Sequence, residues 1–166
     1  HYGTRRQRQM CIRDSPLDRR DKAWQEVKAA NPGIEEVAVF GTLDNPIANS
    51  NANQARSVLQ ANSDITVMFA PYDEFAKGVK LAVDEAGLTD QIDIYSADVS
   101  TADISLMRES GSAWAATVAT NPAVVGEVCV RSLAIMLTGG DPGSSVIVPP
   151  TLITQSFLNE QDIKNM

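Results

Sequence analysis

The sequence contains very few of the side chains that carry enzyme chemistry. Its 166 residues include one histidine, His1, and two cysteines, Cys11 and Cys129. A zinc site or a disulfide framework needs more such residues, and a histidine base has to lie within the folded part of the chain. The sequence has no P-loop, no GxGxxG loop after a strand and no GxSxG nucleophile motif. We therefore expect no enzyme activity, no catalytic residues, no metal and no cofactor.

Aromatic residues and long apolar runs are also scarce. Aromatic side chains make up 5% of the chain and hydrophobic residues 43%, with many alanines and valines. This composition favours closely packed helices on a sheet. No apolar run approaches the ~20 residues that a membrane-spanning helix needs, so we expect no direct membrane span.

Positive charge is missing from most of the chain. The net charge is −7, because residues 1–22 carry +4 and the remainder carries −11. An acidic body repels phosphates, which argues against a nucleic-acid partner. Residues 1–16 have no amphipathic period and include RQMCIRDS, a string that resembles translated adapter sequence. We interpret residues 1–16 as a non-native or disordered tail. A genuine basic tail is the alternative.

Turn residues divide the rest of the chain into alternating helices and strands. Helical spacing of apolar residues predicts helices at 22–30, 52–59, 75–86 and 124–137, and a further helix through Ile104 and Met107. Short apolar runs predict strands at 37–40, 65–70, 92–96 and 115–119. Continuous apolar strands that alternate with helices are typical of a parallel sheet with helices on both faces. The predicted fold class is therefore α/β.

The C-terminal part departs from this alternation. A strand at 146–148 is followed by Pro149 and Pro150, which cannot lie in a central strand and so predict a crossover or hinge. Residues 152–154 and a short polar helix at 158–164 come next. The helix at 124–137 is apolar around much of its circumference, so it needs cover on more than one side. Its cysteine, Cys129, is expected to be a core residue.

Polar residues follow the predicted strands at the end where parallel sheets bind ligands. Tyr72 and Asp73 follow the second strand, Asp98 the third and Thr120 the fourth. No cation and no base accompany them. A carboxylate accepts strong hydrogen bonds from hydroxyl groups, and a tyrosine ring can lie against the apolar face of a sugar. These residues predict a site for a small hydroxyl-rich ligand.

Each of these residues also has a purely structural interpretation. Asp73 and Asp98 can cap the helices that follow them, Tyr72 can cover the sheet edge, and Thr120 can cap the helix after Pro122. Trp114 is interpreted as a packing residue rather than as a platform for a sugar.

Three ordered motifs occur at 65–86 (ITVMFAPYDEFAKGVKLAVDEA), 94–104 (IYSADVSTADI) and 114–126 (WAATVATNPAVVG). Together they resemble the type I periplasmic sugar-binding proteins, which are the solute receptors of ABC importers. The resemblance covers roughly residues 23–166 and is greatest to the branch of pentose, rhamnose and autoinducer receptors. It implies one lobe of a two-lobed protein that closes on a sugar.

The resemblance also implies an organisation and a site. Residues 17–121 would form the second, C-terminal ligand-binding lobe, and residues 122–166 would supply a helix and crossover strands that pack partly on a first lobe. The family's ligand contacts fall on Tyr72, Asp98 and Thr120, with Asp73 beside the first. Relatives often have Asn or Asp at the Tyr72 position and Gln at the Thr120 position. The resemblance therefore does not predict which sugar is bound.

The partners implied are a small sugar and the membrane permease of an ABC importer, in the periplasm or cell envelope. The alternative is the effector-binding domain of a LacI-type repressor, which shares the fold. The APYDEFAKG and DVSTADI segments resemble the transport receptors more closely. A small doubly wound enzyme is a third possibility, against which the absence of a base, a cation and a phosphate loop counts.

Overall fold

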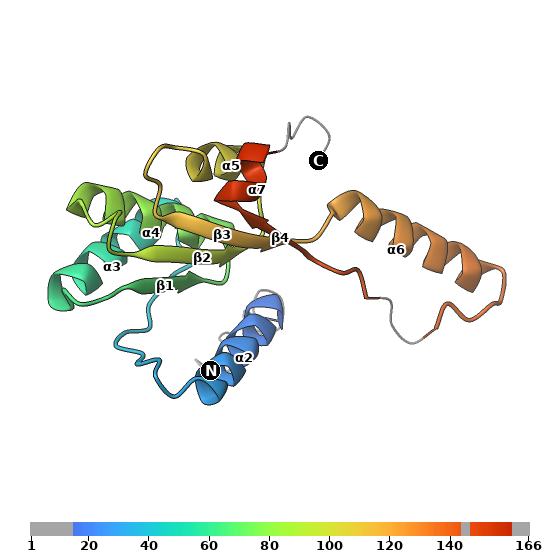
Figure 1. The fold of residues 1–166 in the computed structure, drawn as a ribbon. Helices are drawn as coiled ribbons and strands as arrows, with labels where there is room; N and C mark the ends of the chain where they lie inside the picture. Colours follow the sequence, from blue (N-terminus) through green and yellow to red (C-terminus); the bar gives the residue numbers. More distant parts are fainter. Residues whose placement is uncertain (1–14, 144–146, 161–166) are drawn as a thin grey trace.

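The computed structural model describes residues 15–143 and 147–160. Residues 1–14 of the predicted tail lie outside this range, and Ser15 and Pro16 begin the first helix. In chain order the elements are α2 (Ser15–Ala30), α3 (Ile47–Ala61), β1 (Val67–Ala70), α4 (Asp73–Ala86), β2 (Asp93–Ala97), α5 (Thr101–Met107), β3 (Trp114–Ala119), α6 (Pro122–Leu137), β4 (Thr151–Thr154) and α7 (Gln155–Glu160) (Figure 1).

The four strands form one sheet in the order β1-β2-β3-β4. The first three strands are parallel, as predicted, with Phe69 opposite Tyr95. The fourth strand is antiparallel, with Thr117 opposite Ile153, so the sheet is mixed rather than wholly parallel. After β3 the chain leaves at the carboxyl end of the sheet into α6, and it returns from that same side. A strand that re-enters from that side runs opposite to its neighbour.

Helices cover one face of the sheet closely. Met68, Ile94 and Ile153 point to this face and are 7%, 0% and 0% exposed. They share a core with residues of α4 and α7, and α3 packs against α4. The two helices are in close contact at Gly78, where an added Cβ would lie 2.3 Å from the Ala48 carbonyl oxygen. Only glycine fits this contact.

The opposite face has sparser cover, and among the described elements α2 provides it. The Trp24 ring of α2 stacks on Phe69 of β1, with centroids 5.3 Å apart and planes at 21°. Elsewhere on this face Val67, Tyr95 and Leu152 remain 51%, 42% and 59% exposed. Helices on both faces are therefore confirmed, but they cover the two faces unequally.

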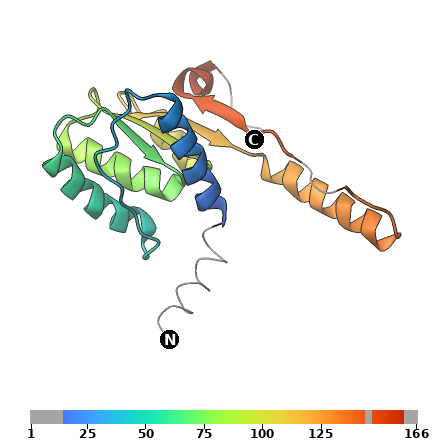
Figure 2. The ribbon, with the colours of Figure 1, turned by 90° about the horizontal axis from the view of Figure 1, so that it is seen from below.

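Helix α6 extends away from the rest of the fold (Figures 1 and 2). It has no buried residue, although Val130, Leu133 and Leu137 are apolar. Cys129 is exposed, so its expected place in a core is wrong for the structure described. The reason is that none of the described elements packs against this helix.

Three further expectations from the sequence are corrected. Residues 37–40 are not a strand, because they lie across a groove from β1 rather than beside it and have no ladder partner. The last helix begins at Gln155 rather than near 158, and residues 161–166 lie outside the described range. Of the strand expected at 146–148, residue 146 lies outside that range, and residues 147–148 are not in a strand.

Candidate functional site

Polar residues follow β1, β2 and β3 at the carboxyl ends of these strands, the edge of the sheet at which they were predicted. Asp98 directly follows β2, and Thr120 directly follows β3. The β2–β3 register pairs Ala97 with Val118, so the two strands end side by side and bring Asp98 and Thr120 to the same edge.

Asp98 is held in an uncommon backbone conformation, with φ of 73°. Aspartate tolerates this left-handed region better than most residues do. Its backbone N–H donates to the Val118 carbonyl at 2.9 Å, and the Thr117 hydroxyl donates to its carbonyl at 2.7 Å. These bonds fix the backbone and leave the carboxylate to make contacts of its own. The helix after it is capped by Ser100 and Asp103, so the capping interpretation of Asp98 is wrong.

Arg20 of α2 reaches this carboxylate, although no cation was predicted at the strand ends. Its Nη1 and Nη2 groups donate to Asp98 Oδ2 and Oδ1 at 2.7 and 2.8 Å. Nη1 also donates to the Pro71 carbonyl oxygen. The two side chains are 29% and 38% exposed, so both remain reachable from solvent. Arg20 lies four residues before Trp24, and this one-turn spacing puts both on the same face of α2.

A pocket of about 520 Å³ lies between α2 and the carboxyl ends of the strands. Asp98 and Thr120 both line it, together with Arg20. Its other walls include the apolar side chains of Trp24 and Phe69. This volume falls within the range of small-molecule sites in proteins. The pocket lining thus combines a carboxylate, a guanidinium and a hydroxyl with aromatic rings.

Tyr72 and Asp73 lie beside this pocket but do not line it. Tyr72 is the N-cap of α4 and makes no side-chain cap hydrogen bond. Asp73 is the first residue of the helix, where its Oδ1 accepts the Glu74 N–H at 2.9 Å. The expected N-cap role of Asp73 is therefore wrong by one position. The Tyr72 ring meets Phe75 edge-on at 5.6 Å, and burial raises the pKa of its hydroxyl.

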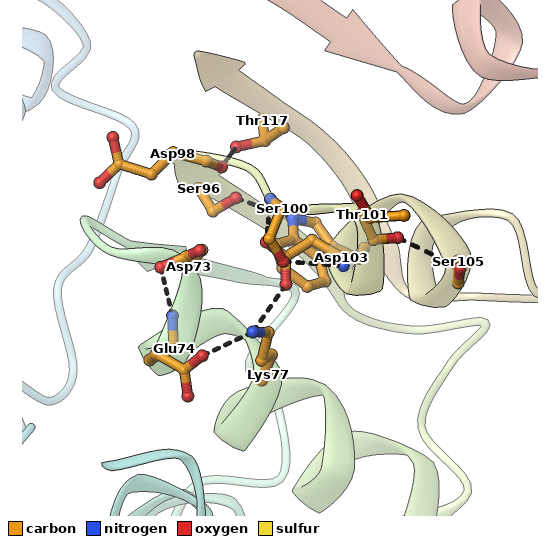
Figure 3. A network of polar contacts seen from close by, with 11 residues as sticks. Asp73, Glu74, Lys77, Ser96, Asp98, Ser100, Thr101, Asp103, Ser105 and Thr117 are labelled. Atoms are coloured by element: carbon orange, nitrogen blue, oxygen red, sulfur yellow. Dashed lines mark hydrogen bonds and ion pairs between the residues drawn. The ribbon is translucent and has the colours of Figure 1, made fainter. Parts of the chain in front are cut away.

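Asp73 faces away from the pocket toward a second carboxylate, Asp103 (Figure 3). Asp103 is fully buried, and Lys77 Nζ lies 3.1 Å from its Oδ1. Burial, together with the hydrogen bond and negative charge of Asp103, raises the pKa of Asp73 from its ordinary value of 3.8 to about 6. Asp73 therefore interacts with the buried carboxylate of Asp103, whereas the carboxylate of Asp98 interacts with Arg20 beside the pocket.

Thr120 is exposed and does not cap the following helix. Asn121 caps α6, because its Oδ1 accepts the N–H groups of Ala123 and Val124 at 2.9 and 3.4 Å. Trp114 is fully buried, and its Nε1 donates to Ser96 Oγ at 2.8 Å, which confirms its interpretation as a packing residue.

Two features are absent from the described part of the chain. Within residues 15–143 and 147–160, no group of three or more metal-binding side chains gathers at one place. No helix in that part of the chain is long and apolar enough to cross a membrane.

Residues 13–141 match the model of a protein family described as the periplasmic binding protein domain. The chain belongs to this family. Among solved structures, it is similar to the 5-methylthioribose transporter solute binding protein of Thermotoga lettingae, in complex with 5-methylthioribose. The two share 39% identity with a TM-score of 0.84, over 92% of this chain and 48% of that one.

Two further solved structures extend this comparison. A sugar ABC transporter structure from Yersinia enterocolitica is 32% identical, with a TM-score of 0.80, over 89% of this chain and 44% of its own. A carbohydrate transporter solute binding protein from Agrobacterium radiobacter, in complex with D-arabinose, is 25% identical, with a TM-score of 0.71, over 85% and 46%. This chain therefore spans about half the length of the structures it matches. Comparison with curated proteins gives no match.

Proposed function

We propose that this chain forms one ligand-binding lobe of a receptor that binds a sugar or a similar polyhydroxylated solute and delivers it to an ABC transporter. The observation that carries the proposal is the bidentate Arg20–Asp98 pair beside a pocket of about 520 Å³ at the carboxyl ends of the strands. The relatives of known structure at 39% and 32% identity are both transporter proteins, which favours an importer over a repressor.

The chemistry of the pocket supports a ligand rich in hydroxyl groups. A hydroxyl both donates and accepts hydrogen bonds. The Asp98 carboxylate accepts from hydroxyls, and the Arg20 guanidinium donates to them, each through a charge-assisted bond. The aromatic rings of Trp24 and Phe69 offer apolar surface to the C–H face of a sugar ring. Partial exposure lets a ligand replace water around the ion pair without leaving either charge buried and unpaired.

Four residues are proposed as ligand contacts on the basis of the sequence: Tyr72, Asp73, Asp98 and Thr120. Asp98 and Thr120 line the pocket directly, and Arg20 joins them. Tyr72 and Asp73 are proposed at its edge, next to Pro71, to which Arg20 donates a hydrogen bond. Asp73 is the weaker of these proposals, because its carboxylate is engaged with Glu74 and Asp103.

The lobe boundaries are proposed as the resemblance suggested them. In this proposal residues 17–121 form the second, C-terminal lobe, which carries the pocket, and residues 122–166 supply α6 and crossover strands that pack partly on a first lobe. The exposed apolar surface of α6 supports this division. The proposed partners are a sugar and a membrane permease, and the proposed location is the periplasm or cell envelope. Reversible binding, without chemical change of the ligand, is the whole of the proposed activity.

The proposal is tested by NMR titration of the 166-residue chain with 5-methylthioribose, D-arabinose and D-tagatose. We expect at least one sugar to shift the amide signals of Asp98, Val118 and Thr120. Asp98→Ala should weaken that binding by about 1–3 kcal/mol, because the ligand hydroxyls lose a charged acceptor. The matched control is Asp93→Ala, which removes an exposed carboxylate from the opposite end of the same strand and should leave affinity unchanged.

Two results would overturn the proposed site. Shifts confined to residues far from the pocket would place the ligand elsewhere. An unchanged affinity in Asp98→Ala would remove this residue from the binding surface.

A further inference from the structure

Two loops at the carboxyl ends of the sheet are linked on the side of the pocket. Residues 71–72 join β1 to α4, and residues 98–100 join β2 to α5. Arg20 bridges the two loops, because its Nη1 group donates to the Pro71 carbonyl at 2.5 Å and to Asp98 Oδ2 at 2.7 Å. The position of the Asp98 carboxylate beside the pocket therefore depends on the separation of the two loops.

The same two loops are linked a second time, away from the pocket (Figure 3). Asp103 Oδ2 accepts the Ser100 N–H at 2.5 Å, which holds the loop that follows β2. The carboxyl group of Asp73, directly after the other loop, makes a hydrogen bond with Asp103. Asp103 is 0% exposed, so water does not screen this link. Its strength depends on the charges of the two carboxyl groups.

Acidic groups outnumber basic ones around Asp73. Lys77 Nζ lies 3.1 Å from Asp103 Oδ1 and 2.5 Å from Glu74 Oε1, so these two carboxylates share the ammonium group of Lys77. When Asp73 is also ionised, the cluster carries three negative charges and one positive charge. A proton on Asp73 therefore lowers the repulsion within the cluster.

The other charged groups near the two loops leave this imbalance in place. Asp98 and Arg20 form an ion pair of their own at 2.7 Å. Burial raises the pKa of Tyr72 from its ordinary value of 10, so this phenol is neutral near pH 7. Both oxygens of Asp103 already face an N–H or an ammonium group. The proton of the carboxyl pair is therefore carried by Asp73, whose pKa is raised to about 6.

We infer that a proton on Asp73 couples the two loops and makes solute binding beside the Arg20–Asp98 pair tighter in mildly acidic than in neutral solution, an inference that rests on the proposed function. With the proton, Asp73 donates to Asp103 and the second link is closed. Without it, two neighbouring carboxylates repel each other, and the loops relieve the repulsion by separating. Because Arg20 spans the same loops, their separation also displaces Asp98 from its place beside the pocket.

The direction of the pH dependence follows from linkage. A bound solute that holds the loops together favours protonated Asp73, so binding raises the pKa of Asp73 above its value of about 6 in the free chain. Affinity is therefore highest below about pH 6 and falls as the pH rises through that value, by at most about tenfold for each pH unit. Binding about three- to tenfold weaker at pH 7.5 than at pH 5.5 is the expected result.

Calorimetric titration of the 166-residue chain with 5-methylthioribose, D-arabinose and D-tagatose at pH 5.5 and pH 7.5 measures this ratio. Asp73→Asn keeps a hydrogen-bond donor toward Asp103 without the charge, so the ratio should disappear. The matched control is Asp90→Asn, which neutralises an exposed carboxylate at a turn outside the cluster and should keep the ratio of the unchanged chain.

A readout without sugar separates this inference from the proposed function. In an NMR pH titration of the ¹⁵N-labelled chain alone, the Asp98 amide and the Arg20 Nε–H should shift with a midpoint near pH 6, because both respond to the charge of Asp73. Asp73→Asn should abolish this midpoint. Asp103→Asn removes the like charge and should move the midpoint toward the ordinary value of 3.8.

Several outcomes would overturn the inference. They are equal affinity at the two pH values, tighter binding at pH 7.5, and a ratio or an Asp98 midpoint that persists in Asp73→Asn. If none of the three sugars binds at either pH, the proposed function fails for them. The titration of Asp98 in the free chain then decides the inference, since a midpoint near pH 6 supports the coupling and its absence refutes it.

Discussion

At the scale of single residues, two aspartates that were both predicted as ligand contacts have different surroundings. Asp98 is fixed at positive φ by Thr117 and Val118, and its carboxylate meets a guanidinium beside the pocket. Asp73 faces the buried carboxylate of Asp103. A guanidinium of opposite charge stabilises the ionised carboxylate of Asp98, whereas burial near a like charge favours protonation of Asp73.

The raised pKa of Asp73 predicts a dependence of stability on pH. Its folded pKa is about 6 and its ordinary value 3.8, so the native state binds the extra proton between these values. Stability should therefore fall as pH rises from about 4 to 6 and change little above that. Asp73→Asn should raise the free energy of unfolding at pH 7.5 by roughly 1–2 kcal/mol, less than the full shift implies because the side chain is partly exposed.

Urea unfolding of the two proteins at pH 4 and pH 7.5 measures this difference. The two should have nearly equal stability at pH 4, where Asp73 is mostly protonated. Asp90→Asn, at an exposed turn position, is the control and should change neither value. An equal effect of Asp73→Asn at both pH values would show that the carboxylate does not titrate in this way.

At the scale of elements, the contact between α3 and α4 determines how the covered face of the sheet is built. Gly78 faces the Ala48 carbonyl oxygen and the Ala52 backbone nitrogen, and an added Cβ would lie 2.3 and 2.9 Å from them. Backbone atoms of a packed helix cannot move aside locally. The glycine therefore sets the spacing of the two helices, and through α4 it sets their position on β1 and β2.

Gly78→Ala should lower the free energy of unfolding by about 1–3 kcal/mol, because overpacking forces the two helices apart. Gly126→Ala, in α6, is the matched control, since no atom lies within 4 Å of the added Cβ. The control should leave stability unchanged or raise it by up to about 1 kcal/mol through helix propensity. Thermal unfolding followed by circular dichroism compares them. Equal effects of the two substitutions would contradict the close-packing argument.

At the scale of the whole molecule, the described part of the chain is one covered sheet with two surfaces that lack cover. The first is the groove beside β1, and the second is α6, where Leu133 is 59% exposed and Leu137 is 87% exposed. Contiguous apolar surface of this kind marks an interface. Both surfaces are consistent with a chain that spans about half the length of its relatives.

We expect the chain on its own to associate through α6. Sedimentation velocity should detect self-association that grows with concentration, and Leu133→Glu should reduce it by placing a charge on that surface. Leu81→Glu is the control, because it adds the same charge on α4, where Leu81 is 40% exposed. A chain that stays monomeric at all concentrations and unfolds cooperatively would contradict the expectation.

The sequence alone determined the order of elements and the end of the sheet at which the polar residues meet. Apolar runs of strand length and helical spacing are local signals, so β1, β2, β3 and the helices between them were predicted near their observed bounds. That residues 37–40 do not form a strand could not be predicted in this way. A strand forms only when its neighbour supplies hydrogen bonds, and that neighbour is not part of the local sequence.

Only the tertiary structure brought Arg20 to Asp98, because the two residues are far apart in the chain and no motif links them. It likewise separated Asp73 from the pocket and turned it toward Asp103. Spacing in a sequence fixes which loop a side chain lies on. The packing of α2 and α5 against the sheet decides which charges those loops meet, and hence which carboxylate is available to a ligand.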